Sequence, residues 1–530
     1  MKASYIDYHE TGYLSSMMAR FLQNDPVFAP FISYKPDIDG FKKLINTRKI
    51  TTDRNVLVET LKSQYAKTGL QSSSAVYTNI ELLQEENTYT ITTGHQLNLF
   101  TGPLYFIYKI VTAINLAEDL KRHFPDKNFV PVYWMASEDH DFAEINHANL
   151  HGKKISWDTQ TSGAVGRLNT SSITAVLKNY KAALGISEHA EKLSEIISKA
   201  YLNHSDLASA TRCLVHTLFE KYGLVIIDAD EHRLKQLFAN IIEKDITRQH
   251  SYHEITESSS ILEKLGFKIQ VNTREINFFY LKDSLRERIT KDGEYYYVLN
   301  SDIRFTEQEL KEEIRSFPER FSPNVIMRPL YQEVILPNLA YIGGSGELAY
   351  WLQLKKNFDF YQINFPILVL RNSALIADEK QHDKLARLGL SWKDIFKKTE
   401  EIQKDWVKKH SLHVLSLHDE WNELSCVFEK IKLRAYKIDP TLSPSTEAVK
   451  ARLHKAILNL EKKLLKAEKR NHEEAMHTIE TIKNRLFPNG SLQERVDNFG
   501  LFYVKYGDRF IEALLQSFKP LDFKFTILEP

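Results

Sequence analysis

Apolar runs and helical patterns alternate along the first two thirds of the 530-residue chain. Runs typical of strands occupy residues 89–93, 129–136, 223–227 and 365–370. Residues 104–120, between the first two runs, carry apolar side chains broadly on one helical face. Strands separated by helices predict an α/β fold with a mostly parallel sheet and helices on both faces. Ligands of such sheets bind beyond the carboxyl ends of the strands.

Two polar segments interrupt this alternation. Residues 156–203 are polar and mostly helical in pattern. Residues 286–321 predict a small α+β unit with a hairpin-like run at 295–299. We interpret both as insertions that elaborate a doubly wound core, which spans residues 1–377.

The pattern becomes helical from about residue 378. Its clearest part predicts one continuous helix over residues 445–487, in which apolar side chains recur every seven positions. Heptad spacing with flanking Lys and Glu is typical of a coiled coil. We therefore assign residues 378–487 to an α-helical coiled-coil domain, a helical hairpin or bundle that could act as a dimer arm. Residues 488–530, with two short helices and a final strand, are expected to dock back on the core.

Composition narrows the classes of partner. Lys and Arg number 70 against 69 Asp and Glu, a net charge of +1, so the chain has no excess charge to attract nucleic acid or an anionic membrane surface. Its two cysteines, Cys213 and Cys426, form no CxxC pair, which argues against a zinc knuckle or a disulfide framework. The start of the chain does not resemble a signal peptide, and no run approaches the roughly 20 apolar residues that cross a bilayer. We expect a cytoplasmic protein.

The first segment with candidate chemistry is 93–105, which joins a strand to a helix and contains two Thr-Gly pairs. Backbone N–H groups at such a junction can bind phosphate or carboxylate. The alternative is a tight turn that uses glycine for its backbone freedom. No GxxxxGK[ST] occurs, so this is not a standard phosphate loop. The candidate binding residues are Gly94, His95, Gln96, Asn98, Thr101, Gly102, Tyr105 and Lys109.

The second segment, 137–147, follows an apolar strand and holds six side chains capable of acid–base chemistry or metal binding. If residues 140–147 form a helix, His140, Glu144 and His147 share one face and could bind a divalent metal or orient a substrate amine. The alternative is a helix start whose acidic residues favour the helix dipole. No metal is firmly assigned. The candidate catalytic residues are Glu138, Asp139, His140 and Asp141.

The third segment, 327–351, contains a GxGxxA match at 344–349. This match is weak for a dinucleotide site because it lies far from the first strand of the sheet. The glycines could still let a ligand approach the backbone closely, and a helix-capping loop is the alternative. The candidate binding residues are Arg328, Gln332, Glu333, Gly343, Gly344, Gly346 and Glu347.

At these segments the sequence resembles the bacillithiol-biosynthesis cysteine-adding enzymes, the BshC family. The matching blocks are TGHQLNLFTGPLYFIYK (93–109), PVYWMASEDHDFAEINH (131–147), PNVIMRPLYQEVILPNLAYIGGSGELAYWLQLK (323–355) and LFPNGSLQER (486–495). They occur in the expected order over most of the chain. One departure is His95-Gln96, where the family carries Gln-Gln.

The resemblance implies a Rossmann-like core with connecting insertions and a coiled-coil arm used for homodimerisation. It also implies a ligase that forms an amide between the cysteine carboxylate and the amine of glucosaminyl-malate, in the last step of bacillithiol synthesis. ATP, with Mg²⁺, is the expected source of an activated carboxylate. A general base would help to keep the amine neutral. His140 or Asp141 could serve as this base, with Glu138 and Asp139 binding the ammonium group or Mg²⁺.

Two other functions remain open at this point. A metal-dependent hydrolase would use His140, Glu144 and His147, and a tightly bound, stoichiometric transition metal would favour it. A non-catalytic coiled-coil scaffold would carry only a degenerate nucleotide-binding core. The dense polar groups at the strand ends argue against the scaffold, which has no need of them.

Overall fold

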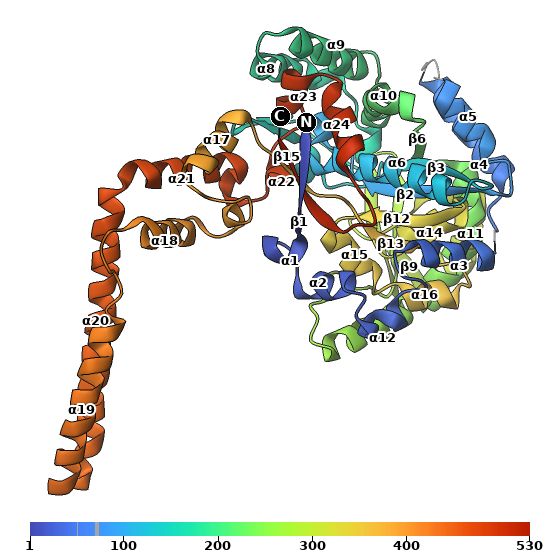
Figure 1. The fold of residues 1–530 in the computed structure, drawn as a ribbon. Helices are drawn as coiled ribbons and strands as arrows, with labels where there is room; N and C mark the ends of the chain where they lie inside the picture. Colours follow the sequence, from blue (N-terminus) through green and yellow to red (C-terminus); the bar gives the residue numbers. More distant parts are fainter. Residues whose placement is uncertain (50, 69–73, 530) are drawn as a thin grey trace. The chain divides into compact units, whose positions relative to one another are not determined.

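The computed structural model describes residues 1–49, 51–68 and 74–529, which form two compact units (Figure 1). The core unit comprises residues 1–9, 13–375 and 491–528, and the helical unit comprises 10–12, 376–490 and the residues from 529 onward. The borders predicted from the sequence were residues 377 and 487. No helix among the described residues is long and apolar enough to cross a membrane.

The core unit is built on a sheet of five parallel strands in the order β13-β12-β2-β3-β6. These are β2 (Thr88–His95), β3 (Asn128–Met135), β6 (Val225–Asp228), β12 (Asn338–Gly343) and β13 (Ile367–Leu370). Numbered along the chain, the order is 3-2-1-4-5, that of a Rossmann fold. The Rossmann-like prediction is therefore confirmed. The strand order reverses between β2 and β12, so a ligand crevice is expected where these two strands end.

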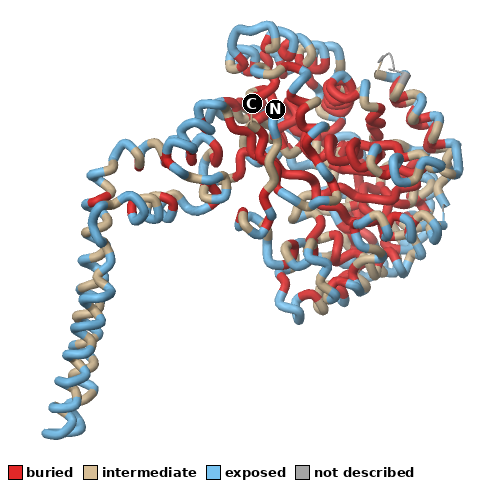
Figure 2. Tube along the Cα trace, viewed as in Figure 1, coloured by how far each residue is buried: buried red, intermediate tan, exposed pale blue. Residues whose placement is uncertain are grey.

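The central strands are buried along almost their whole length, which explains their continuous apolar character (Figure 2). Helix α6 (Tyr105–His123) contributes Ala113, Leu116 and Leu120 to a cluster that also contains residues of β2, β12 and β13. The polar side chain of Asn338 in β12 is also buried. Its Oδ1 accepts hydrogen bonds from the hydroxyls of Thr90 and Thr92, at 3.2 and 2.8 Å. These bonds satisfy the polar groups that β2 and β12 bury between them.

Two insertions elaborate the sheet. The first, between β3 and β6, contains α7 (Phe142–Ile145), β4 (His147–Leu150), β5 (Lys153–Ser156), α8 (Thr174–Leu184), α9 (Glu188–Leu202) and α10 (Leu207–Phe219). The second is an antiparallel sheet, ordered β10-β9-β8-β7-β11, with one helix packed beside it. It contains β7 (Phe278–Lys282), β8 (Leu285–Asp292), β9 (Tyr295–Val298), β10 (Arg304–Thr306), α13 (Glu307–Ser316) and β11 (Phe321–Pro323). This second insertion begins one strand before the expected start at residue 286.

Further helices surround the sheet and join its strands. They are α2 (Ser16–Leu22), α3 (Ile38–Thr47), α4 (Arg54–Lys67), α5 (Ser74–Leu82), α11 (His232–Arg248), α12 (His250–Lys264), α14 (Arg328–Ile335), α15 (Ser345–Trp351) and α16 (Lys355–Phe360). The C-terminal part of the core unit has three helices, where the sequence predicted two. These are α22 (Gln493–Val496), α23 (Gly500–Tyr506) and α24 (Arg509–Ser517). A small sheet orders β1 (Lys2–Asp7), β15 (Lys524–Glu529) and β14 (Ala374–Ile376) as β1-β15-β14.

The helical unit contains α17 (Glu379–Arg387), α18 (Thr399–His410), α19 (His418–Ile438), α20 (Ser443–Asn471) and α21 (Glu473–Leu486). The prediction of one helix over residues 445–487 is wrong, because the backbone leaves helical geometry at His472 (φ −115°, ψ 34°). Beyond the break, α21 buries Met476, Ile479 and Ile482, whereas α20 buries only Glu468. The two helices therefore serve different purposes: α21 packs inside the unit, and α20 pairs with α19 while staying largely exposed (Figure 2).

Candidate active site

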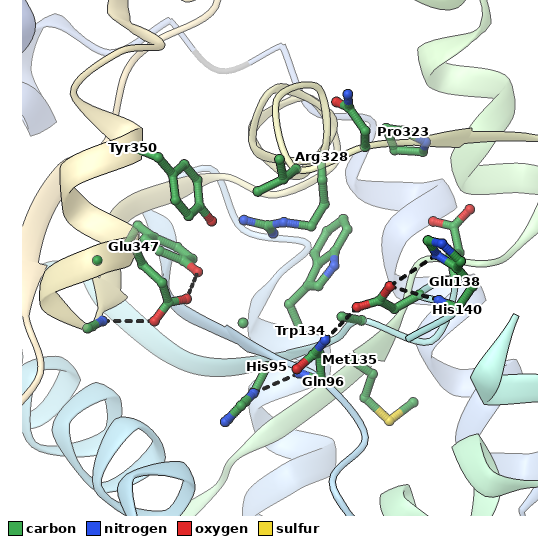
Figure 3. Close-up of a pocket in the computed structure, with 18 of the residues that line it drawn as sticks. His95, Gln96, Trp134, Met135, Glu138, His140, Pro323, Arg328, Glu347 and Tyr350 are labelled. Carbon is green, nitrogen blue, oxygen red and sulfur yellow. Dashed lines mark hydrogen bonds and ion pairs between the residues drawn. The ribbon is translucent and has the colours of Figure 1, made fainter. Parts of the chain in front are cut away.

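A cavity of about 830 Å³ opens at the carboxyl ends of β2, β3 and β12, where the strand order reverses. All of its lining residues belong to the core unit. Figure 3 shows Glu347 on one side, Glu138 and His140 on the other, and Arg328 and Trp134 between them. This position is where a doubly wound sheet binds its ligands.

An ion pair links the two loops that flank the reversal. The Lys109 ammonium, buried in α6, donates to the Gly94 carbonyl oxygen at 2.6 Å and to Glu347 Oε1 at 2.8 Å. Glu347 Oε2 accepts from the Gly344 amide at 2.8 Å, and Oε1 accepts from the Tyr341 hydroxyl at 2.9 Å. Burial acts to raise the Glu347 pKa, but Lys109 and these donors outweigh it and lower the pKa to about 2. The carboxylate is therefore charged and ties the end of β2 to the start of α15.

His95 is held as a neutral imidazole at the end of β2. Its Nδ1 accepts a hydrogen bond from the Gln96 amide at 2.8 Å, which leaves the hydrogen on Nε2. The ring stacks against Tyr105 and Phe106, each with 5.2 Å between ring centroids. Burial, helped by the Lys109 charge, lowers the His95 pKa to about 3. His95 can thus donate a hydrogen bond but carries no charge near neutral pH.

The Gln96 side chain joins the first two candidate segments. Its Nε2 donates to Asp139 Oδ2 at 2.6 Å and to Glu144 Oε2 at 3.1 Å. Asp139 Oδ1 accepts in addition from the His140 amide at 2.7 Å. Burial raises the pKa of Asp139, but these donors and Arg286 hold it well below its usual range. Asp139 is therefore a charged anchor for the loop and a weak base.

Glu138 lies deeper in the pocket wall. Its Oε1 contacts the ammonium of Lys235, a fully buried residue of α11 that also donates to the Phe321 carbonyl oxygen at 2.9 Å. Its Oε2 makes no hydrogen bond to any residue that the structure describes. Burial raises the Glu138 pKa, and Lys235 opposes this effect only in part. Glu138 is thus the most basic carboxylate on the pocket wall.

His140 is engaged by an arginine from the second insertion. Arg286 Nη1 donates to His140 Nδ1 at 2.5 Å, and the guanidinium lies 4.0 Å above the Phe279 ring centroid. Because arginine has donors only, Nδ1 must supply its lone pair and Nε2 must carry the hydrogen. In this arrangement His140 offers a hydrogen-bond donor to the pocket, and no free lone pair.

Residues 140–147 do not form the single helix on which the metal hypothesis depended. Helix α7 is a single turn, capped by Asp141, which accepts from the Glu144 amide at 3.3 Å, and His147 already belongs to β4. His140, Glu144 and His147 therefore do not share a helical face. Among residues 1–49, 51–68 and 74–529, no cluster of three or more His, Cys, Asp or Glu could hold a metal. The hydrolase hypothesis loses the geometry on which it rested.

The structure brings many of the candidate residues together. Those that line the cavity are Gly94, His95, Gln96, Tyr105, Lys109, Glu138, Asp139, His140, Arg328, Gly344, Gly346 and Glu347. Those that do not are Asn98, Thr101, Gly102, Asp141, Glu144, His147, Gln332, Glu333 and Gly343. Some of the second group support the first, since Gln332 Oε1 accepts from Arg328 Nη1 at 3.0 Å while Gln332 Nε2 donates to Glu333 at 2.9 Å. Gly102 is structural: its φ is +60°, and a Cβ there would lie 2.6 Å from the Asn98 Cβ.

A further set of lining residues was not predicted from the sequence. They are Trp134, Asn272, Arg274, Arg286, Arg288, Asn324, Tyr341, Tyr350, Arg371 and Arg495. Seven lie in or beside the second insertion or follow β13 and the helical unit, whereas Trp134, Tyr341 and Tyr350 lie in β3, β12 and α15. The available signal was the set of blocks that match the BshC family, which contain Trp134, Asn324, Tyr341, Tyr350 and Arg495.

The pocket carries an excess of positive charge. Its lining includes seven Lys and Arg side chains against three carboxylates, those of Glu138, Asp139 and Glu347. Each carboxylate is already held by Lys235, Gln96 or Lys109. Within the part of the chain that the structure describes, Arg274, Arg288 and Arg495 form no ion pair with a carboxylate. Such a lining favours an anionic ligand.

Comparison with known proteins identifies the family. Residues 1–372 match the model described as "Bacillithiol biosynthesis BshC, N-terminal Rossmann-like domain", and residues 374–530 match "Bacillithiol biosynthesis BshC, C-terminal coiled-coil domain". Relatives from Flavobacterium psychrophilum and Flavobacterium johnsoniae are 46% and 44% identical over the full length of both chains. A relative from Chlorobaculum tepidum is 30% identical over 91% of this chain and 90% of its own. All three bear the name "Putative cysteine ligase BshC". The chain therefore belongs to the BshC family of bacillithiol biosynthesis, with both the Rossmann-like and the coiled-coil domain of that family.

Proposed function

We propose that this protein joins the carboxylate of cysteine to the amine of glucosaminyl-malate in the pocket between β2 and β12, as the last step of bacillithiol biosynthesis. The observation that carries the proposal is the cationic lining of that pocket, seven Lys and Arg against three engaged carboxylates. The malate carboxylates and the phosphates of ATP are the anionic groups that such a lining would bind. The names of the relatives support the ligase class.

ATP is the proposed source of the activated carboxylate. Cysteine attacks a phosphate of ATP through its carboxylate oxygen, which gives an acyl-adenylate with release of pyrophosphate, or an acyl phosphate with release of ADP. The amine then attacks the acyl carbon, the C–N bond forms, and the C–O bond to AMP or phosphate breaks. Glu138 and Asp139 are engaged within the protein, so their contacts do not fit a resident Mg²⁺. We expect Mg²⁺ to enter with the phosphates.

Glu138 is the proposed acceptor of the amine proton. Its free Oε2 and raised pKa suit a base, whereas Arg286 occupies the His140 lone pair and Asp141 caps α7 outside this pocket. His140 would then donate from Nε2 to a substrate oxygen. This division of roles replaces the expectation of His140 or Asp141 as the base.

Thiol profiling by mass spectrometry in a strain that lacks the gene tests the proposal. We expect bacillithiol to disappear, glucosaminyl-malate to accumulate, and the wild-type gene to restore the product. Glu138→Gln should fail to restore it, because loss of a general base costs about 10²- to 10⁴-fold in rate. Glu118→Gln, an exposed change on α6, is the matched control and should restore it fully. Unchanged bacillithiol in the deletion strain would overturn the function, and full rescue by Glu138→Gln would overturn the base.

A further inference from the structure

The short helix α22 contains two adjacent charged residues, of which one lines the pocket and the other is buried behind it. Arg495 lines the cavity. Glu494 is 1% exposed and lies inside the protein. Both stand in the LFPNGSLQER block.

Glu494 holds a second arginine of the pocket wall. Arg371, directly after β13, donates from Nη2 to Glu494 Oε1 at 2.7 Å, and its side chain is 5% exposed. Its Nη1 donates to the Asn372 carbonyl oxygen and to Ser373 Oγ, both at 3.0 Å. Glu494 Oε2 accepts from the Ala374 amide at 3.2 Å. The Arg371 guanidinium is therefore fixed in place by bonds along one edge.

The other edge of Arg371 faces the pocket. Arg371 Nε lies 3.8 Å from the point where a Cβ on Gly344 would stand, so the glycine leaves room in front of the guanidinium. The Arg371 Cζ also lies 5.4 Å from the Tyr105 ring centroid. Burial raises the Tyr105 pKa, while Arg371 and Arg495 both act to lower it. Both guanidinium groups line this cavity, and Arg495 directly follows Glu494, the residue that holds Arg371.

We propose that Arg371 and Arg495 form a subsite for a phosphate or carboxylate group of the substrate, and that Glu494 is a positioning residue that holds Arg371. Guanidinium groups bind such oxyanions through paired, charge-assisted hydrogen bonds. The inference rests on the proposed function, since ATP supplies phosphates and glucosaminyl-malate supplies carboxylates. Arg495 has no carboxylate partner among the described residues, so its charge is available to a ligand.

Isothermal titration of the full chain with two probes, inorganic pyrophosphate and L-malate, tests the subsite. Arg495→Gln should weaken binding of one probe at least about tenfold, which corresponds to about 1.4 kcal/mol. The control Arg509→Gln, an exposed change on α24, should stay within about twofold of wild type. The probe that loses affinity identifies the source of the oxyanion. Wild-type affinity of Arg495→Gln for both probes, or no binding of either probe to the wild type, overturns the subsite.

The positioning role of Glu494 has its own readout. Glu494→Gln should raise KM for the substrate that carries the identified group about tenfold, with kcat changed far less. Ser373→Ala, which removes one bond to Arg371 and keeps the ion pair, should shift KM in the same direction by a smaller factor and serves if Glu494→Gln fails to fold. Unchanged KM in the variant measured overturns the positioning role. The probe titrations do not require ligation, so an inactive ligase with intact probe binding would overturn the proposed function alone.

Discussion

Replacing Lys109 by Met tests whether the Lys109–Glu347 pair joins the two loops at the reversal of the strand order. Met has a similar length and an apolar, flexible side chain, so the change removes the ammonium with little change in volume. It leaves the Glu347 carboxylate with only the Gly344 amide and the Tyr341 hydroxyl. We therefore expect the carboxyl ends of β2 and β12 to become less stable.

The size of the effect follows from the Glu347 pKa. Its fall from 4.5 to about 2 is worth about 3 kcal/mol at 1.36 kcal/mol per unit. Because the folded pKa is the lower one, this stability is present above pH 4.5 and is lost as pH falls toward 2. The carboxylate side chain is 30% exposed, so solvent screening brings the value toward about 2 kcal/mol. Removing one partner of a fully buried ion pair costs about 3–5 kcal/mol of stability. Because Glu347 is partly exposed, we expect Lys109→Met to cost about 2–3 kcal/mol at pH 7.

Hydrogen exchange measured by mass spectrometry reports this local stability. A loss of 2–3 kcal/mol corresponds to amide exchange about 30- to 150-fold faster in peptides that cover β2 and β12. Peptides from α19 and α20, in the other unit, should not change. Lys192→Met, which breaks an exposed pair with Asp508, is the control and should cost less than about 1 kcal/mol. If Lys109→Met leaves exchange in β2 and β12 within about threefold of wild type, the pair does not join the loops.

Three further changes test other features. In wild type, the unfolded state takes up a proton on His95 below pH 6.5, while the folded imidazole, with a pKa of about 3, stays neutral, so the folded state loses stability as pH falls. His95→Gln should therefore lose less stability below pH 6.5 in calorimetry. A variant with the same pH dependence as wild type would contradict this. Gly102→Ala should lower the melting temperature more than Gly490→Ala. Both glycines have a positive φ, but only a Cβ at position 102 would clash, with Asn98, and this clash should cost about 1–3 kcal/mol. Equal shifts in melting temperature would refute the clash. Homodimerisation stays a prediction: Leu460→Glu, on exposed α20, should shift a dimer toward monomer in size-exclusion chromatography with light scattering, and a monomeric wild type would contradict it.

Apolar runs in the sequence predicted the strands that are buried along almost their whole length. The runs that became β3, β6 and β13 are continuously apolar because helices or insertions cover both faces. The central strand β12 was not predicted, since it begins with Asn338 and ends with Gly343 and so resembles a loop. Asn338 is tolerated there because Thr90 and Thr92, in another strand, donate to its Oδ1, while its Nδ2 donates to Glu333. That compensation is a tertiary contact and leaves no local pattern.

The candidate site also contains residues that the sequence predicted and residues that it did not. Residues next to a strand end, such as Gly94 and Glu138, were found because parallel strands bring their carboxyl ends to one edge. Arg286 and Arg495 were missed, because their approach to the pocket depends on how an insertion sheet and the C-terminal helices pack. His147 was grouped with His140 on the assumption of a helical period, which the chain abandons after one turn of α7.

The chain order of the sheet has a consequence for biosynthesis. Strand β2 pairs with β12, and Thr90 and Asn338 lie 248 positions apart. At about 5–20 residues per second, a ribosome needs roughly 10–50 s to deliver β12 after β2. During that time one edge of β2 is exposed to unwanted pairing, and folding must wait for a contact of high sequence separation. Arg495 emerges later still, so nascent chains pass through a long interval in which chaperones can act before any pocket is complete.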